Sequence, residues 1–211
     1  MPPEGFVSEV DEDWRRSLFH IPDLDVKFLA ALSAIDEAYA EQVHGSGCPR
    51  CGGAVDRADY PRKPRGELGE AAGAYQRRRS FCCRREGCRR RATPPSLRFL
   101  GRKVYVAVIV IVASAAAQAT SIVGRGSARR VHGVPARTVR RWLAWWQTVF
   151  ALSAFWSEAR AFFATPVEVD ALPSSLLSRF GGERPEALVK MLRFTAPITT
   201  ASVKARIAMV V

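Results

Sequence analysis

The sequence predicts a mostly α-helical protein with one small β element before its middle. The β element is predicted because all five cysteines fall between residues 48 and 88, on two short turns joined by a longer loop. The helices are predicted because apolar residues recur with helical spacing both before and after this stretch. With 211 residues, the chain has room for one medium domain or for two or three small ones.

We expect four segments along the chain. The first is an acidic N-terminal helical segment, residues 1–43. A β-ribbon that contains the cysteines and a basic insertion follows over residues 44–99. A helical domain is predicted for residues 100–150, and a second helical segment for residues 151–211.

The net charge of +12 is unevenly distributed along the chain. Residues 1–43 contain three basic and ten acidic side chains, whereas residues 57–103 contain fifteen basic and four acidic ones. Residues 125–147 contain six arginines and no acid. Two arginine-rich blocks separated by an uncharged segment favour binding to phosphates. A solvated basic surface, or one that docks on the acidic N-terminal segment, is the alternative.

The first predicted helix begins at Asp23 or Asp25, either of which could cap it, and ends near Val43. Its apolar positions have helical spacing and comprise Phe28, Leu29, Leu32, Ile35 and Tyr39. Nothing in this helix is typical of a catalytic site. We therefore expect it to pack against the rest of the chain or against a partner.

The cysteine stretch predicts a metal site. Cys-Pro-Arg-Cys-Gly-Gly at 48–53 is followed by Phe-Cys-Cys-Arg-Arg-Glu-Gly-Cys at 81–88. Two thiolate pairs, each on a tight turn, can surround one tetrahedral Zn²⁺ ion. Disulfides or buried thiols explain this pattern less well, because no secretory signal is visible. No histidine or acid in the stretch completes an open catalytic site, so the zinc is expected to be structural.

Five cysteines for four ligands leave one over. Residues 75–83 predict a strand, on which alternate residues share a face. Phe81 would then share a face with Cys83, an order typical of a ribbon strand that enters a metal-binding turn. The predicted ligands are Cys48, Cys51, Cys83 and Cys88. Cys82 is the predicted spare, and a reversed choice between Cys82 and Cys83 is the alternative.

Residues 104–123 form a long apolar stretch that predicts a buried helix. Its continuous apolar part ends at Ala113, and small and polar residues such as Gln118 follow. Basic residues lie beyond both ends, so the positive-inside rule gives no orientation in a membrane. We therefore expect a helix inside the protein and no association with a membrane.

Another helix is predicted after Gly133, in the order Gly-Val-Pro-Ala-Arg-Thr-Val-Arg-Arg-Trp. Gly133 would supply a turn, and Pro135 suits the first turn of a helix. The predicted inward stripe comprises Val139, Trp142, Trp146 and Val149. Small residues and arginines lie on the other faces, which suits a helix that enters the major groove of DNA. An amphipathic core helix with solvated arginines is the alternative.

This order of motifs resembles the zinc-ribbon and helix-turn-helix region of bacterial insertion-sequence transposases, and still more the small proteins that accompany such elements. The resemblance is carried by the CPxC turn, the basic strand with Cys-x4-Cys, the apolar helix and GVxxRTVxRW, over about residues 46–150. It implies a zinc ribbon followed by a helix-turn-helix three-helix domain. It also implies double-stranded DNA of transposon ends as partner, with a transposase as a candidate second partner.

The resemblance does not extend to catalysis. Transposases of that kind use a carboxylate triad on an RNase H-like domain. Beyond residue 150 the chain is too short and too helical for that fold, and its only acids are Glu158, Glu168, Asp170, Glu183 and Glu186. The three histidines are scattered, so no catalytic triad can be assembled from them. We expect no enzyme.

The sequence therefore predicts a DNA-binding accessory or regulatory protein of a transposable element, with a structural zinc ion. The residues expected at the DNA are Arg129, Arg130, Ala136, Arg137, Thr138, Arg140 and Arg141, with Arg89, Arg90 and Arg91 of the ribbon. The alternative is a zinc-ribbon adaptor whose arginines bind an acidic protein or RNA. The acidic N-terminal segment is unlike a secretory signal, so we expect a cytoplasmic protein at the bacterial nucleoid.

Overall fold

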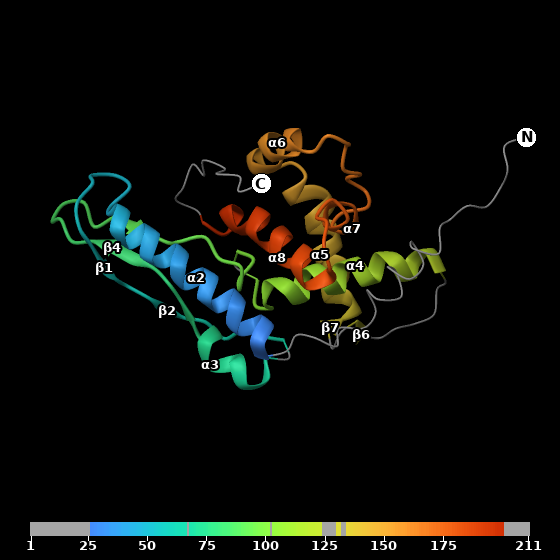
Figure 1. Ribbon diagram of the computed structural model, residues 1–211, viewed down its shortest axis with the longest axis horizontal. Coiled ribbons are helices and arrows are strands. Elements are labelled where there is room, and N and C mark those ends of the chain that lie inside the picture. The colour runs from blue at the N-terminus through green and yellow to red at the C-terminus, as the bar shows by residue number, and fades with distance from the viewer. Residues whose placement is uncertain (1–25, 67, 102, 124–129, 132–133, 201–211) are drawn as a thin grey trace, which may run out of the picture.

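The computed structural model describes residues 26–66, 68–101, 103–123, 130–131 and 134–200 (Figure 1). Over these residues the protein is mostly helical, with small antiparallel sheets near a four-cysteine cluster. This agrees with the predicted combination of helices and a small β element. Figure 1 shows an elongated molecule, with the strands of the ribbon at one end and most of the helices at the other.

Helix α2 (Val26–Ser46) extends from the helical region to the ribbon (Figure 1). Leu29 and Leu32 near its start are buried in the large core of the helical region. Ala40 is buried in a small core that contains the cysteines. The predicted N-terminal helix is thus confirmed from Val26 onward, and its predicted capping aspartates lie outside the described residues.

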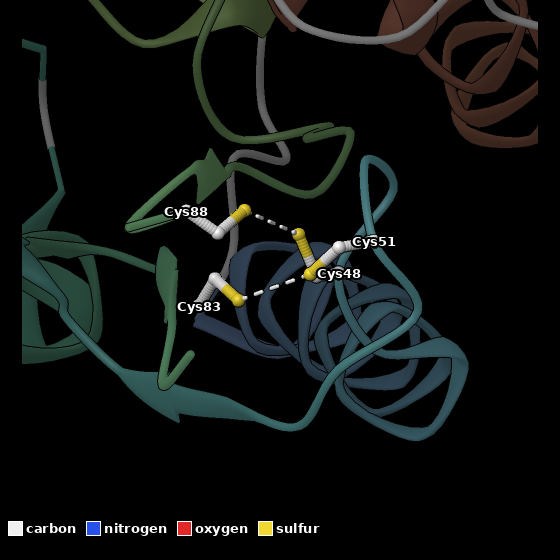
Figure 2. A group of neighbouring side chains, drawn as sticks. All are labelled: Cys48, Cys51, Cys83 and Cys88. Carbon is white, nitrogen blue, oxygen red and sulfur yellow. Dashed lines mark hydrogen bonds between the residues drawn. The ribbon is translucent and has the colours of Figure 1, made fainter. Parts of the chain in front are cut away.

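The ribbon contains a three-stranded antiparallel sheet. Strand β4 (Phe81–Cys83) lies in its middle, between β1 (Val55–Arg57) and β5 (Arg91–Ala92). Strands β2 (Tyr60–Pro61) and β3 (Arg77–Arg78) form a second antiparallel pair. These short strands keep the two cysteine turns side by side at one end of the sheet (Figure 2).

The predicted strand over residues 75–83 is interrupted. Tyr75 ends the short helix α3 (Ala72–Tyr75), which follows a 3-10 turn at Gly69–Ala71. Between β3 and β4, an Asp59 carboxylate oxygen accepts the backbone N–H of Ser80. A side chain therefore takes the place of a backbone partner at this point, which separates the two strands.

Helix α4 (Ala107–Val123) packs against α5 (Ala136–Trp145), α7 (Ser174–Leu177) and α8 (Arg184–Thr195). Its side chains are fully buried from Ala107 to Ala116, because other elements surround that part of the helix. The helix predicted for residues 104–123 is therefore confirmed from Ala107 onward, and its burial is confirmed from Ala107 to Ala116. Within the described residues, no helix has both the length and the apolar character needed to cross a membrane.

Helix α5 (Ala136–Trp145) packs against α4 and follows a small hairpin. The hairpin pairs β6 (Arg130–Val131) with β7 (Val134–Pro135). Gly133, which was predicted to supply the turn before this helix, lies outside the described residues. The β-branched Val131 and Val134 are paired across the hairpin, and such residues favour extended backbone. The helix that was predicted after Gly133 is present as α5 and begins directly after Pro135.

The end of α5 widens into a π-helical turn (Trp146–Phe150). One extra residue in a helical turn shifts the faces of the residues that follow it. Phe150 is 1% exposed and packs in the core, whereas Val149 is 61% exposed. The predicted inward stripe is confirmed for Val139, Trp142 and Trp146, and it is wrong for Val149.

Three further helices complete the helical region: α6 (Ala154–Ala159), α7 (Ser174–Leu177) and α8 (Arg184–Thr195). Two 3-10 turns, Arg160–Phe162 and Ala196–Thr199, extend α6 and α8. The Ser153 hydroxyl caps α6 by accepting the backbone N–H of Trp156. These elements share one apolar core with α4 and α5.

Candidate metal centre

The Sγ atoms of Cys48, Cys51, Cys83 and Cys88 lie within 4.8 Å of one another (Figure 2). The distance is 3.7 Å between Cys48 and Cys88, and 3.5 Å between Cys51 and Cys83. Zinc–sulfur bonds of about 2.3 Å in a tetrahedron require sulfur atoms about 3.8 Å apart. A disulfide requires about 2.05 Å, and all five cysteines are free. The cluster is therefore compatible with a structural metal such as Zn²⁺.

The first cysteine turn directly follows α2. The backbone N–H of Cys48 donates to the Gly53 carbonyl, and the N–H of Gly52 donates to the Cys48 carbonyl. Gly47 has a φ of +72°, and a Cβ there would lie 3.0 Å from the Gly53 carbonyl oxygen. Only glycine fits that position without strain. The turn therefore places Cys48 and Cys51 on the same side, facing the second pair (Figure 2).

The second cysteine turn begins at the end of β4. Cys83 lies opposite Val55 of β1, and this pairing sets the second turn beside the first. The backbone N–H of Cys88 donates to the Arg85 carbonyl, and Gly87 has a φ of +77°. This tight loop returns Cys88 toward Cys83, so the wide Cys-x4-Cys spacing still brings both sulfur atoms to one point.

Cys82 lies on the face of strand β4 that points away from the other four cysteines. Phe81 and Cys83 are buried on one face, while Cys82 is only half-buried on the other. The Cys82 thiol donates to the backbone carbonyls of Cys83 and Arg89. The alternation predicted from the sequence is thus confirmed, and the structure brings together the four cysteines that were predicted. Metal binding by these four remains a prediction.

The four thiols differ in their electrostatic surroundings. The backbone N–H of Arg50, which hydrogen-bonds Cys48, lowers the pKa of that thiol to about 6. Burial raises the pKa of the Cys83 thiol. Four adjacent thiolates repel one another, and a divalent cation between them removes this obstacle to ionisation. Four sulfur ligands would leave no open coordination position, so the centre suits a structural ion rather than a catalytic one.

The arginines predicted to contact DNA lie on separate elements. On α5, Arg137, Arg140 and Arg141 are exposed, and Ala136 and Thr138 are half-buried. On the ribbon, Arg89, Arg90 and Arg91 are exposed. Arg130 belongs to β6, and Arg129 lies outside the described residues. The structure does not gather these residues into one site, because the ribbon and α5 lie at different ends of the molecule (Figure 1).

A buried ion pair was missed from the sequence. Asp36 of α2 accepts hydrogen bonds from the Arg98 guanidinium at 2.8 Å and from the Leu97 backbone N–H at 2.6 Å. Both side chains of the pair are at most 2% exposed. Asp36 has the helical spacing of Leu29 and Leu32, on the face that α2 buries. An acid on an apolar helix face was the signal that could have found the pair.

No protein-family model matches this chain, and neither the curated proteins nor the solved structures include a match to it.

Proposed function

We propose that this chain is a DNA-binding accessory or regulatory protein of a transposable element. A structural zinc ion would hold the ribbon together, and α5 would contact base edges in the major groove. The proposal rests on one observation, namely that the exposed and the buried faces of α5 carry different kinds of residue. Its exposed faces present three arginines and no acid, and its other face is buried.

The buried face gives α5 a fixed orientation. Val139 is 1% exposed and Trp142 is 6% exposed, and the ring of Trp142 packs edge-on against Tyr105 at 5.1 Å. Side chains on an anchored helix approach DNA along a defined direction, which specific recognition requires.

The exposed faces have the residue types that direct base recognition uses. Arg137 and Arg140 are three positions apart, so they lie on neighbouring parts of the helix surface. Ala136 is half-buried and Ala144 is exposed, and both are small enough to allow a close approach to the groove. An arginine can donate two hydrogen bonds to a guanine edge, which contributes about 1–3 kcal/mol of discrimination.

The association with a transposable element rests on the resemblance of residues 46–150 described above. Strands β6 and β7 precede α5, and the arginines of α5 are exposed. The proposal therefore depends on α5 itself and not on the form of the preceding connection.

Selection of binding sites from random DNA duplexes tests the proposal. The zinc-loaded protein should select a sequence motif, and Arg137→Ala or Arg140→Ala should flatten the preference at one or two positions. Arg160→Ala, an exposed arginine just after α6, is the matched control and should leave the motif unchanged. An unchanged motif in both α5 variants would mean that α5 packs rather than recognises. Binding to RNA or to an acidic protein, without any DNA motif, would favour the adaptor alternative.

A further inference from the structure

The arginines of the ribbon fall into two groups. Those of the first group already form ion pairs or hydrogen bonds with other residues of the protein. Arg57 pairs with Glu41 of α2 at 2.6 Å, and Arg84 pairs with Asp56 at 2.6 Å. Arg79 contacts both Glu37 and Asp59, at 2.7 and 2.5 Å. The Arg91 guanidinium donates to the Ala58 carbonyl. A phosphate would have to compete with these partners.

The second group comprises Arg50, Arg85, Arg89 and Arg90, which we call the cysteine-turn arginines. All four are exposed, and none has a side-chain hydrogen bond or ion pair within the described part of the chain. Glu86 is the one acid on the two cysteine turns and is also exposed. The turns therefore present one anion and four cations without a hydrogen-bonded acid, although the Asp56 carboxylate, which Arg84 binds, also attracts Arg89.

The four cysteines hold these arginines at one end of the ribbon. Arg50 lies between Cys48 and Cys51, whereas the other three follow Cys83 on the second turn. The two turns are in contact, since a Cβ built on Gly53 would lie 3.7 Å from the Cβ of Arg85. The backbone N–H of Cys83 donates to the Arg90 carbonyl at 2.9 Å, which fixes the end of the second turn. An ion bound by the cysteines would therefore fix both turns together.

Arg89 adds an independent observation. Its φ of +43° lies in the left-handed region, and no other non-glycine residue of the described chain has a positive φ. Glycine or asparagine would occupy this conformation at lower cost. The Arg89 N–H donates to the Arg85 carbonyl at 3.3 Å and so closes the turn, while the bulky side chain at a position that favours glycine is compatible with a role in binding.

We propose that the cysteine-turn arginines form a surface that contacts the phosphate backbone of DNA, and that the metal centre positions this surface. The inference rests on the proposed function, because it assigns a second contact region to the same DNA complex. Phosphate contacts fix the position of a protein on a duplex but carry no sequence information directly. We therefore assign sequence recognition to α5 and phosphate contact to the cysteine turns.

Salt dependence of binding tests this assignment. The logarithm of the binding constant falls with the logarithm of salt concentration by about 0.9 unit for each phosphate neutralised on B-form DNA. Each of Arg50→Ala, Arg85→Ala and Arg90→Ala should therefore reduce the slope by about 0.9 unit, on the selected duplex and on a random one alike. Arg57→Ala and Arg84→Ala are the matched controls, since those arginines are held by acids, and should leave the slope unchanged. Glu86→Gln should tighten binding.

Arg89→Gly separates a role in binding from a role in folding. Glycine relieves the left-handed conformation, so the zinc-loaded variant should melt at a temperature no lower than the parent protein. The same variant should lose about 0.9 unit of the salt slope. A fall in both the melting temperature and the affinity would show that Arg89 supports the fold, and would remove it from the proposed surface.

The two proposals fail in different ways. If the unmodified protein binds no duplex, both the proposed function and this inference are overturned. If it selects a motif but the cysteine-turn variants keep the full salt slope, the inference alone is overturned. Equal losses in the cysteine-turn variants and in the ion-paired controls would also overturn it, because a general effect of net charge would then explain the result.

Discussion

The ribbon and the helical region differ in the size of their apolar cores. The core of the helical region contains many large buried side chains, among them Trp146, Trp156 and Phe150. The small core around the cysteines contains Val55 and Phe81 as its only buried large apolar side chains within the described residues, whereas Tyr75 and Leu97 of the same segment are buried in the large core. Burial of one such side chain contributes about 1.5–3 kcal/mol, so two of them cannot offset the entropy of ordering the cysteine turns and their sheet.

Ion pairs do not compensate for this small core. The pairs Arg57–Glu41 and Arg84–Asp56 are more than half exposed, and pairs of this kind contribute about 0–1 kcal/mol each. A structural zinc ion contributes about 10–16 kcal/mol in small zinc-binding peptides. An ion bound by the four cysteines would therefore supply the stability that the small apolar core lacks. A ribbon held in this way can expose many arginines without loss of stability.

Metal removal should give the largest difference between the two regions. Chelation, or Cys51→Ser, should unfold the ribbon, because the apparent binding free energy of about 10–16 kcal/mol is then lost. Helix α4 should remain folded, because its contacts lie in the apolar core. Hydrogen exchange should show loss of protection in β4 and retained protection in α4, while elemental analysis follows the zinc.

Cys82→Ser is the control for metal removal, because Cys82 lies outside the four-sulfur cluster. This variant should keep about one zinc ion per chain. Retention of zinc after Cys83→Ser, with its loss after Cys82→Ser, would contradict the assignment of the ligands.

A cavity in the large core should affect only the helical region. Phe150→Ala should destabilise it by about 3–5 kcal/mol, because Phe150 is buried in contact with Trp146 and Trp156. Val149→Ala, one residue earlier on the exposed side, should change stability by no more than about 0.5 kcal/mol. Urea unfolding measures both. A larger effect at Val149 would contradict the π-helical turn.

Asp36→Asn should test how firmly α2, the helix that reaches both regions, is anchored. Asparagine can still accept the Leu97 N–H, but it leaves the buried Arg98 guanidinium without a counter-charge. Removing one partner of a buried ion pair costs about 3–5 kcal/mol, because an uncompensated buried charge remains. The expected effect in urea unfolding is therefore in that range, whereas Glu41→Gln, which removes an exposed pair, should cost less than about 1 kcal/mol. Equal effects of the two variants would mean that the buried pair does not anchor α2.

The smallest predicted effect is a pH dependence of the helical region. Burial lowers the pKa of Lys103 to about 8 from its ordinary value of 10.5. Between these values the unfolded chain binds more protons than the folded one, so stability should rise with pH. One proton gives at most about 1.4 kcal/mol per pH unit. The Lys103 ammonium lies 3.3 Å from the ring centre of Trp145, and this attraction for the charged form makes the slope smaller.

Thermal unfolding of the zinc-loaded protein at pH 8 and pH 10 measures the Lys103 effect. Lys103→Met should remove the rise in stability, since methionine has no proton to lose. A rise of the same size in the variant would assign it to another group.

Local patterns of the sequence were sufficient for much of the candidate site. The Cys48–Cys51 turn and the alternation of Phe81, Cys82 and Cys83 depend only on neighbours in the chain. The face of α5 that carries Arg137 and Arg140 was equally predictable, because helical periodicity depends on residues three and four apart. Prediction failed at Val149, where the π-helical turn changes that periodicity.

Local sequence patterns were thus enough to locate the cysteine cluster, the main helices and the sign of the charge on each segment. The packing of distant elements established which arginines have an acidic partner. Arg57 and Arg85 both lie in the basic part of the ribbon sequence. Arg57 forms an ion pair with Glu41 of α2, whereas no described side chain pairs with Arg85. The Asp36–Arg98 pair likewise joins residues far apart in the chain. Such contacts depend on how separate elements pack, and no local pattern contains that information.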